Sequence, residues 1–226
     1  MCKAHLLFVG CLVLLTACGN GSSSAVPGIK HDTLATKKDS SADNDTAYHG
    51  FVHADEYFTK PTINLPADLA VFVPKGYTAL DTISGDLNLD SIPDKILILR
   101  KAHEDTIDQD DTAGRRPLLI LTGQADHSFK LAAQNDKVVL CYHCGGAGGD
   151  AYQETVIKNG YFSVEYGGNT PHVWSRIVTF RYSAADSSWY LHKDGRSGEG
   201  THKSSIRTEK DFGKMPIGQF DVYSSF

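Results

Sequence analysis

The chain has 226 residues, of which 41% are hydrophobic and 22% charged, and its formal net charge is −5. This composition is typical of a folded protein rather than of a disordered one. A negative balance without any run of Lys and Arg argues against nucleic acid or an anionic lipid surface as the partner.

The first 17 residues, MCKAHLLFVGCLVLLTA, carry one Lys near the start and an apolar run over 6–15, followed by small residues. This pattern predicts a secretory signal peptide, because the apolar run is too short to span a bilayer. The end of this segment, LTAC at 15–18, resembles the bacterial lipobox, in which cleavage precedes a Cys that then carries lipid. An ordinary signal peptide with a chance Cys is the alternative.

The lipobox resemblance implies that Cys18 is lipidated, with palmitate or similar acyl chains, and that the protein is held on a membrane of the bacterial cell envelope. Several acyl chains give lasting attachment, whereas one chain binds only marginally. Gly19, rather than Asp, follows the Cys. In the enterobacterial sorting scheme this implies the outer membrane, facing the periplasm or the cell surface.

After the lipidated Cys, residues 18–50 are rich in Ser, Asp, Thr, Lys and Gly and poor in large apolar side chains. Such a stretch cannot bury enough surface to offset its ordering entropy, so we expect a disordered tether. Its root-mean-square reach is about 30 Å. The three predicted parts are therefore the signal peptide (1–17), the lipidated Cys with its tether (18–50), and a single β-rich domain (51–226).

Within the domain, a short helix is predicted over 65–76, because Pro66 suits a first helical position and Pro74 and Gly76 end the segment. Apolar, β-branched and aromatic runs then alternate with polar turns. We expect a mostly β fold: an antiparallel meander resembling a propeller blade, or a small sandwich, with one or two short helices. The predicted strands are 78–84, 95–101, 117–122, 128–133, 137–140, 152–158, 161–166, 173–182, 189–193 and 204–207.

Two local patterns sharpen this prediction. Asn159-Gly160 between alternating runs is a strong signal for a tight hairpin turn, and 184–188 predicts a second turn. The run ILIL at 96–99 is apolar at consecutive positions. Such a run implies burial on both faces and a central place in the sheet.

Directly before this buried strand lies the most informative stretch, GDLNLDSIPDK at 85–95. Oxygen ligands two residues apart in a tight loop can turn inward onto one hard cation, and Ca²⁺ takes about six to eight oxygens at roughly 2.3–2.6 Å. The loop therefore predicts a calcium site, and a turn without metal is the alternative. The predicted ligands are Asp86, Asn88, Asp90, the backbone carbonyl of Ile92, and Asp94.

This D-x-N-x-D-x-x-x-D loop, the following strand and the turn QADHSF at 124–129 are similar to the FG-GAP and VCBS repeats. In those families the loop binds calcium between two strands of a β-propeller blade, and the resemblance covers 74–130. The sixth loop position is Ser91 rather than Gly, and one copy is present, whereas a closed propeller needs about four blades. The whole chain also resembles a group of uncharacterised bacterial lipoproteins with GDLN, C-x-x-C-G-G and W-Y-L-H-K-D-G segments, and that group has no assigned activity to carry over.

Two further segments leave alternatives open. The pair in Cys141-Tyr-His-Cys144 supplies half of a usual zinc site and lacks the helix of a redox motif, so we favour a local disulfide in an oxidising compartment. The glycine cluster that follows predicts a wide turn, and its closing Asp150 could give an oxygen to a cation.

The acidic run HEDTIDQDD at 103–111 either extends a metal site or forms a solvated loop whose charge Arg115 and Arg116 offset in part.

Aromatic residues are dense in the second half of the chain. Exposed on a flat face, Trp174 or Trp189 would suit stacking on a sugar ring, but aromatics on strands more often form core and cross-strand pairs. The chain has no G-x-S-x-G elbow and no H-E-x-x-H motif, so no nucleophile with its base is apparent.

The sequence thus predicts a membrane-anchored envelope lipoprotein without catalytic activity, carrying a structural calcium loop. Its partners would be the membrane, through the lipid, and an envelope protein or glycan, with no nucleic acid. A carbohydrate-binding module of the envelope is one alternative. An envelope hydrolase is another, and it would need a pocket of converging carboxylates or histidines.

Overall fold

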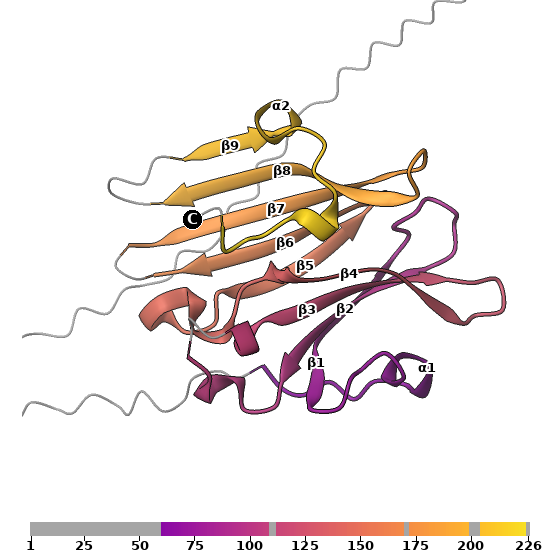
Figure 1. The fold of residues 1–226 in the computed structure, drawn as a ribbon, viewed down its shortest axis with the longest axis horizontal. Helices are drawn as coiled ribbons and strands as arrows, with labels where there is room; N and C mark the ends of the chain where they lie inside the picture. The colour runs from indigo at the N-terminus through magenta and orange to yellow at the C-terminus, as the bar shows by residue number, and fades with distance from the viewer. Residues whose placement is uncertain (1–59, 109–111, 170–171, 199–203, 225–226) are drawn as a thin grey trace, which may run out of the picture. The chain divides into compact units, whose positions relative to one another are not determined.

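The computed structural model describes residues 60–108, 112–169, 172–198 and 204–224, all within the compact unit Phe51–Phe226. The predicted signal peptide, Cys18 and the predicted tether lie outside the described residues. The mostly β fold predicted from the sequence is confirmed, in its sandwich form, with one four-stranded and one five-stranded antiparallel sheet (Figure 1). In the described part of the chain, no helix is long and apolar enough to cross a membrane.

The first sheet is a meander in which each strand pairs antiparallel with the next. The predicted central position of the ILIL strand is confirmed, because this strand, β2, lies between β1 and β3. The predicted strands 128–133 and 137–140 are one continuous strand, β4, so their separation was wrong. The members of this sheet are β1 (Tyr77–Gly85), β2 (Asp94–Lys101), β3 (Arg116–Gly123) and β4 (Phe129–Val139).

The second sheet repeats the meander with five strands. The predicted hairpin turn is confirmed, since Asn159 and Gly160 have φ angles of 50° and 74° between β5 and β6. The last long strand continues five residues beyond the predicted end at 193. The members are β5 (Tyr152–Lys158), β6 (Tyr161–Gly168), β7 (Trp174–Ser183), β8 (Ser188–Gly198) and β9 (Ser205–Thr208).

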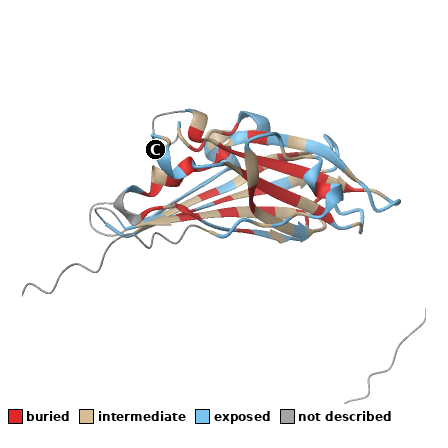
Figure 2. Ribbon diagram, turned by 90° about the horizontal axis from the view of Figure 1, so that it is seen from below, coloured by how far each residue is buried: buried red, intermediate tan, exposed pale blue. Residues whose placement is uncertain are grey.

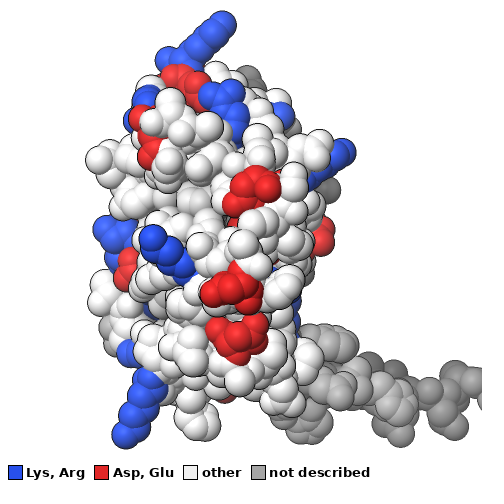
Figure 3. Space-filling model, turned by 90° about the vertical axis from the view of Figure 1, so that its right-hand side faces the viewer, with Lys and Arg blue, Asp and Glu red and all other residues white. Residues whose placement is uncertain are grey.

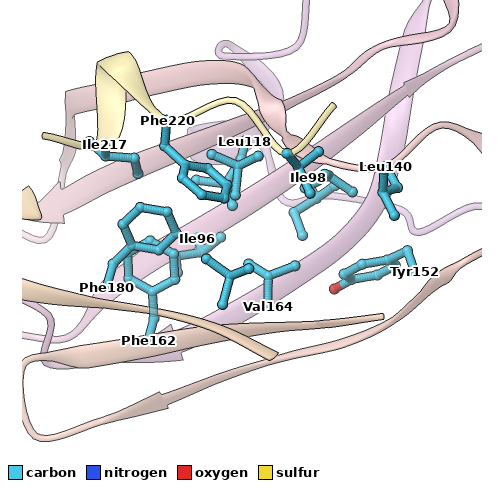
Figure 4. Packing of buried hydrophobic residues seen from close by; sticks show 14 of the residues in the cluster. Ile96, Ile98, Leu118, Leu140, Tyr152, Phe162, Val164, Phe180, Ile217 and Phe220 are labelled. Atoms are coloured by element: carbon cyan, nitrogen blue, oxygen red, sulfur yellow. The ribbon is translucent and has the colours of Figure 1, made fainter. Parts of the chain in front are cut away.

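The main core fills the space between the two sheets (Figure 2). Ile96 and Ile98 of the first sheet point toward Phe162, Val164 and Phe180 of the second (Figure 4). Phe162 and Phe180 stack with their ring centroids 4.9 Å apart, an offset arrangement that aromatic pairs prefer.

A second core lies on the outer face of the four-stranded sheet. Leu97 and Leu99 of β2 pack there beneath the segment that precedes β1. This segment contains α1 (Ala67–Ala70), which is one turn long, whereas a helix over 65–76 was predicted. The chain on either side of that turn stays non-helical because Leu65, Phe72 and Val73 pack individually onto the sheet.

The C-terminal segment closes the open side between β8 and β4. It contains α2 (Glu209–Phe212) and a 3₁₀ turn, η4 (Ile217–Gln219). The Asn135 amide donates to the carbonyls of Ile217 and Phe220 at 2.6 and 2.8 Å, and the Val222 N–H donates to the Lys137 carbonyl at 2.9 Å. These bonds satisfy the polar middle of β4.

Buried tyrosines predict an alkaline limit to stability. Burial raises the pKa of the Tyr223 phenol from 10.0 to about 12, and it raises the pKa values of Tyr152 and Tyr166 as well. A phenol whose folded-state pKa is raised contributes stability that is complete below about pH 10 and is lost as pH rises through the folded pKa. We expect the melting temperature to fall steadily above pH 10.

The variant Tyr223→Phe tests this origin. At neutral pH it should cost about 1 kcal/mol, for the lost bond to the Val139 carbonyl. Above pH 10 its melting temperature should fall less steeply than that of the wild type. Parallel alkaline slopes for the two proteins would contradict the assignment to Tyr223.

Candidate functional site

The predicted calcium loop joins β1 to β2, and the Gly85–Asp94 pair closes it. Asp94 is fully buried. Its Oδ2 accepts bonds from the N–H groups of Leu87 (2.8 Å) and Asn88 (3.2 Å), and its Oδ1 accepts one from Gly123 (2.9 Å). Burial raises the pKa of the Asp94 carboxyl, and these three donors oppose that rise. Asp94 therefore fixes both ends of the loop to the sheet.

The remaining loop oxygens turn toward the loop's own backbone. Asp86 Oδ2 accepts from the Ser91 N–H at 3.0 Å, and Asp90 Oδ1 accepts from Ile92 at 2.8 Å. The Asn88 side chain makes two bonds to Asp90. Its Oδ1 accepts from the Asp90 N–H, and its Nδ2 donates to Asp90 Oδ2. The position where related loops carry Gly is Ser91, and its φ of 69° is in the left-handed region that glycine favours. The backbone thus makes the sharp turn expected there.

One atom in this loop is left without a partner. Asp86 Oδ1 is buried and accepts no hydrogen bond, and a buried carboxylate oxygen without a donor is costly. No group of three or more His, Cys, Asp or Glu side chains converges as a metal site in the described ranges. The three aspartates of the predicted set, Asp86, Asp90 and Asp94, are therefore not brought together in this structure, and their carboxylates accept bonds from backbone N–H groups instead. The donor types and the unsatisfied Asp86 oxygen fit a hard cation.

The same loop also contacts the second sheet. Leu87 inserts fully into the main core, and its carbonyl accepts a bond from Trp189 Nε1 of β8 at 3.3 Å. The Gly160 N–H of the β5–β6 turn donates to the Asp86 carbonyl at 3.3 Å. A Cβ added at Gly160 would lie only 3.0 Å from the nearest side-chain atom of Leu89. Figure 3 faces this end of the sandwich, where acidic and basic side chains are interspersed among uncharged ones.

The disulfide predicted between Cys141 and Cys144 is present, with the two Cα atoms 5.1 Å apart. It lies in a 3₁₀ segment, η3 (Tyr142–Gly148), on the connection that carries the chain from one sheet to the other. Cys141 is buried. With both sulfurs in a disulfide, neither is a thiolate that could ligate zinc.

A buried ion network holds this connection in place. Arg116 is fully buried and makes paired bonds to Glu104 (2.8 and 2.8 Å) and to Asp150 (2.6 and 2.8 Å). Its fifth bond goes to the Leu140 carbonyl at 3.1 Å. The acidic run is therefore not wholly a solvated loop, since Glu104 is buried. The cation that Asp150 meets is the guanidinium of Arg116.

Sequence reasoning missed a second buried pair. Arg176 of β7 makes two bonds to Asp194 of β8, at 2.8 and 2.9 Å, and both side chains are buried. The two residues are 18 positions apart; Arg176 lies within the predicted strand 173–182, and Asp194 directly follows the predicted strand 189–193. No local pattern in the sequence identifies them as partners.

The aromatic residues are mainly core. Trp189 is buried, whereas Trp174 is half-buried and packs against Gly168. A sugar platform built on Trp189 is therefore wrong. Comparison of the chain with known protein families, with curated proteins and with solved structures finds no match.

The contact between the loop and the β5–β6 turn predicts a sensitive glycine. Gly160→Ala places a Cβ at a φ of 74° and 3.0 Å from the Leu89 side chain. We expect a loss of about 1–3 kcal/mol in the free energy of unfolding, measured by urea denaturation. Combining it with Leu89→Ala should recover the steric part of that loss but not the backbone part. If the effects of the two substitutions on the free energy of unfolding simply add, there is no steric contact between the Leu89 side chain and this turn.

Removing the buried guanidinium should be more damaging. Arg116→Met leaves Glu104 and Asp150 without their shared cation, and breaking a buried pair costs about 3–5 kcal/mol. Arg181→Met is the matched control, because its bond to Glu209 is exposed and exposed pairs contribute about 0–1 kcal/mol. Equal losses in urea denaturation would argue against a structural role for the buried network.

Proposed function

We propose that this chain is a lipid-anchored protein of the bacterial cell envelope whose β-sandwich binds one calcium ion in the loop between β1 and β2. The ion's role is structural, and the protein is non-catalytic. The lipobox-like LTAC at 15–18 and the polar stretch after it support the anchor and the tether. Neither lies among the residues that the structure describes.

A single observation supports the calcium site most directly: Asp86 Oδ1 is buried and unsatisfied in a loop of the required ligand types. A cation there would give this oxygen a partner. It would also neutralise the like charges of Asp86, Asp90 and Asp94, which lie within one short loop. Asp94 already holds the loop backbone in place through the N–H groups of Leu87 and Asn88, and the Gly123 N–H ties it to β3. Binding would therefore cost little further ordering of the chain.

The loop's contacts indicate what the ion would stabilise. Leu87 lies in the core shared by the two sheets, and the backbone of Asp86 and Leu87 accepts bonds from the second sheet. An ion that fixes this loop therefore strengthens the joint between the sheets. The domain would keep its shape outside the cytoplasm, where the tether presents it to an envelope protein or glycan.

The test is a thermal melt of the full chain in excess calcium and then in chelator. At a hundredfold excess over the dissociation constant, binding adds about 2.7 kcal/mol, which raises the melting temperature by several degrees. Unchanged melting at about 1 mM calcium would remove the calcium proposal.

Substitutions locate the effect in the loop. Asp90→Ala should abolish the shift caused by calcium and change little in chelator, because its side chain is exposed and bonds only within the loop. Asp126→Ala is the control, since Asp126 caps another turn through Ser128, and it should leave the shift intact. Equal shifts in both variants would place any calcium elsewhere.

A further inference from the structure

The two sheets differ in what covers their outer faces. The segment before β1 packs over the four-stranded sheet. On the outer face of the five-stranded sheet, Val156, Ile177 and Ile206 remain 42%, 42% and 63% exposed. These residues come from β5, β7 and β9, so the exposed apolar surface extends across the sheet.

This face carries two shallow hollows that meet at Thr179. One has a volume of about 480 Å³ and is lined by Val156, Tyr161 and Ser163. The other has a volume of about 330 Å³ and is lined by Ile177, Gly195 and Ile206. Because Thr179 lines both, the two hollows adjoin, and we call the pair the cross-strand groove.

Strand register determines the direction of the cross-strand groove. Val156 pairs with Ser163, Ser163 with Thr179, Thr179 with Lys193, and Lys193 with Thr208. Thr208 lines neither hollow, so the lining residues of this row cross four strands, which at about 4.8 Å between neighbours gives a length of about 14 Å. A groove of this length suits several units of a linear polymer rather than one small molecule.

The floor of the cross-strand groove is low and hydroxylated. Ser163 and Thr179 lie at its centre, with their side-chain oxygens 2.9 Å apart. Gly195 has no side chain to fill the neighbouring hollow, and Ser175 and Ser197 continue the floor on the same side. Short hydroxyl groups both donate and accept hydrogen bonds, so the floor matches a ligand that also offers both.

The rims favour an uncharged ligand. Lys158 and Glu165 line one hollow, and Lys193 and Arg196 line the other. Glu165 lines the same hollow as Lys158, and the Asp194 carboxylate lies 3.7 Å from Arg196, so the positive side chains are largely balanced and no broad field faces a polyanion or polycation. Tyr161 adds an aromatic ring, held edge-on to His192 with centroids 5.3 Å apart, which can cover the apolar face of a ring-shaped unit.

We propose that the cross-strand groove binds a linear, neutral oligosaccharide. Hydroxyl groups of the sugar would meet Ser163 and Thr179, and the C–H faces of its rings would meet Tyr161 and Val156. A second copy of the chain is a poorer match, because a stable interface buries about 800 Å² per partner around an apolar centre. Here the hydroxyl groups of Ser163 and Thr179 stand at the centre, between the apolar side chains.

Calorimetric titration tests the proposal, with the full chain in a detergent that carries no sugar. The probes are neutral hexasaccharides of β-1,4-glucose, α-1,4-glucose, β-1,4-xylose and β-1,4-N-acetylglucosamine. We expect at least one of them to bind. Thr179→Tyr, which raises the floor, should weaken that binding at least about tenfold, and Tyr161→Ser should weaken it about tenfold.

Ala132→Tyr is the size-matched control, because Ala132 is exposed on β4 of the other sheet, and it should bind as the wild type does. Should Thr179→Tyr fail to fold, Tyr161→Ser decides alone. Absence of binding for all four probes at about 10 mM would overturn the proposal, as would equal affinity in Tyr161→Ser. A dimer in sedimentation that Thr179→Tyr or Tyr161→Ser dissociates without sugar would also overturn it and assign the face to a second copy.

Discussion

The fold depends on the burial of both faces of β2. Its four consecutive apolar residues, Ile96 to Leu99, are fully buried, two facing the core between the sheets and two facing the core beneath the segment before β1. Each such side chain contributes about 1.5–3 kcal/mol when removed from water. One strand thus links three layers, so its position limits where every neighbouring element can lie.

The candidate calcium loop takes its geometry from this strand. Asp94 is both the first residue of β2 and the acceptor that ties down the loop backbone and the end of β3. Because β2 cannot move without disturbing two cores, the backbone at both ends of the loop is held in place. A short, polar and partly strained loop is held rigidly in this way. This constraint also explains why Leu87, in the middle of a polar stretch, is buried.

Local signals were enough for the parts of the molecule that depend on neighbours in sequence. The Asn159-Gly160 turn, the doubly buried β2 and the Asp86–Asp94 loop each follow from residues within about ten positions of one another. The extension of β8 to Gly198 did not, because its polar residues become a strand through Asp194 pairing with Arg176 of β7. Likewise, the polar middle of β4 is ordered by the Ile217 and Phe220 carbonyls, 82 and 85 positions away. Composition alone classed such stretches as turns.

The same distinction separates the two candidate sites. The calcium loop is contiguous, so its ligand types and spacing could be read from the sequence. The cross-strand groove arises from the register of strands that are distant in sequence, which brings Ser163, Thr179 and Gly195 beside one another. Each of these residues by itself resembles an ordinary small residue on the solvent side of a strand. They form a common surface only because the strand register aligns them on one face of the sheet. The segment before β1 covers the four-stranded sheet instead of this face. A candidate site on a sheet surface therefore depends on sheet topology, whereas a candidate ion site in a loop depends on the loop itself.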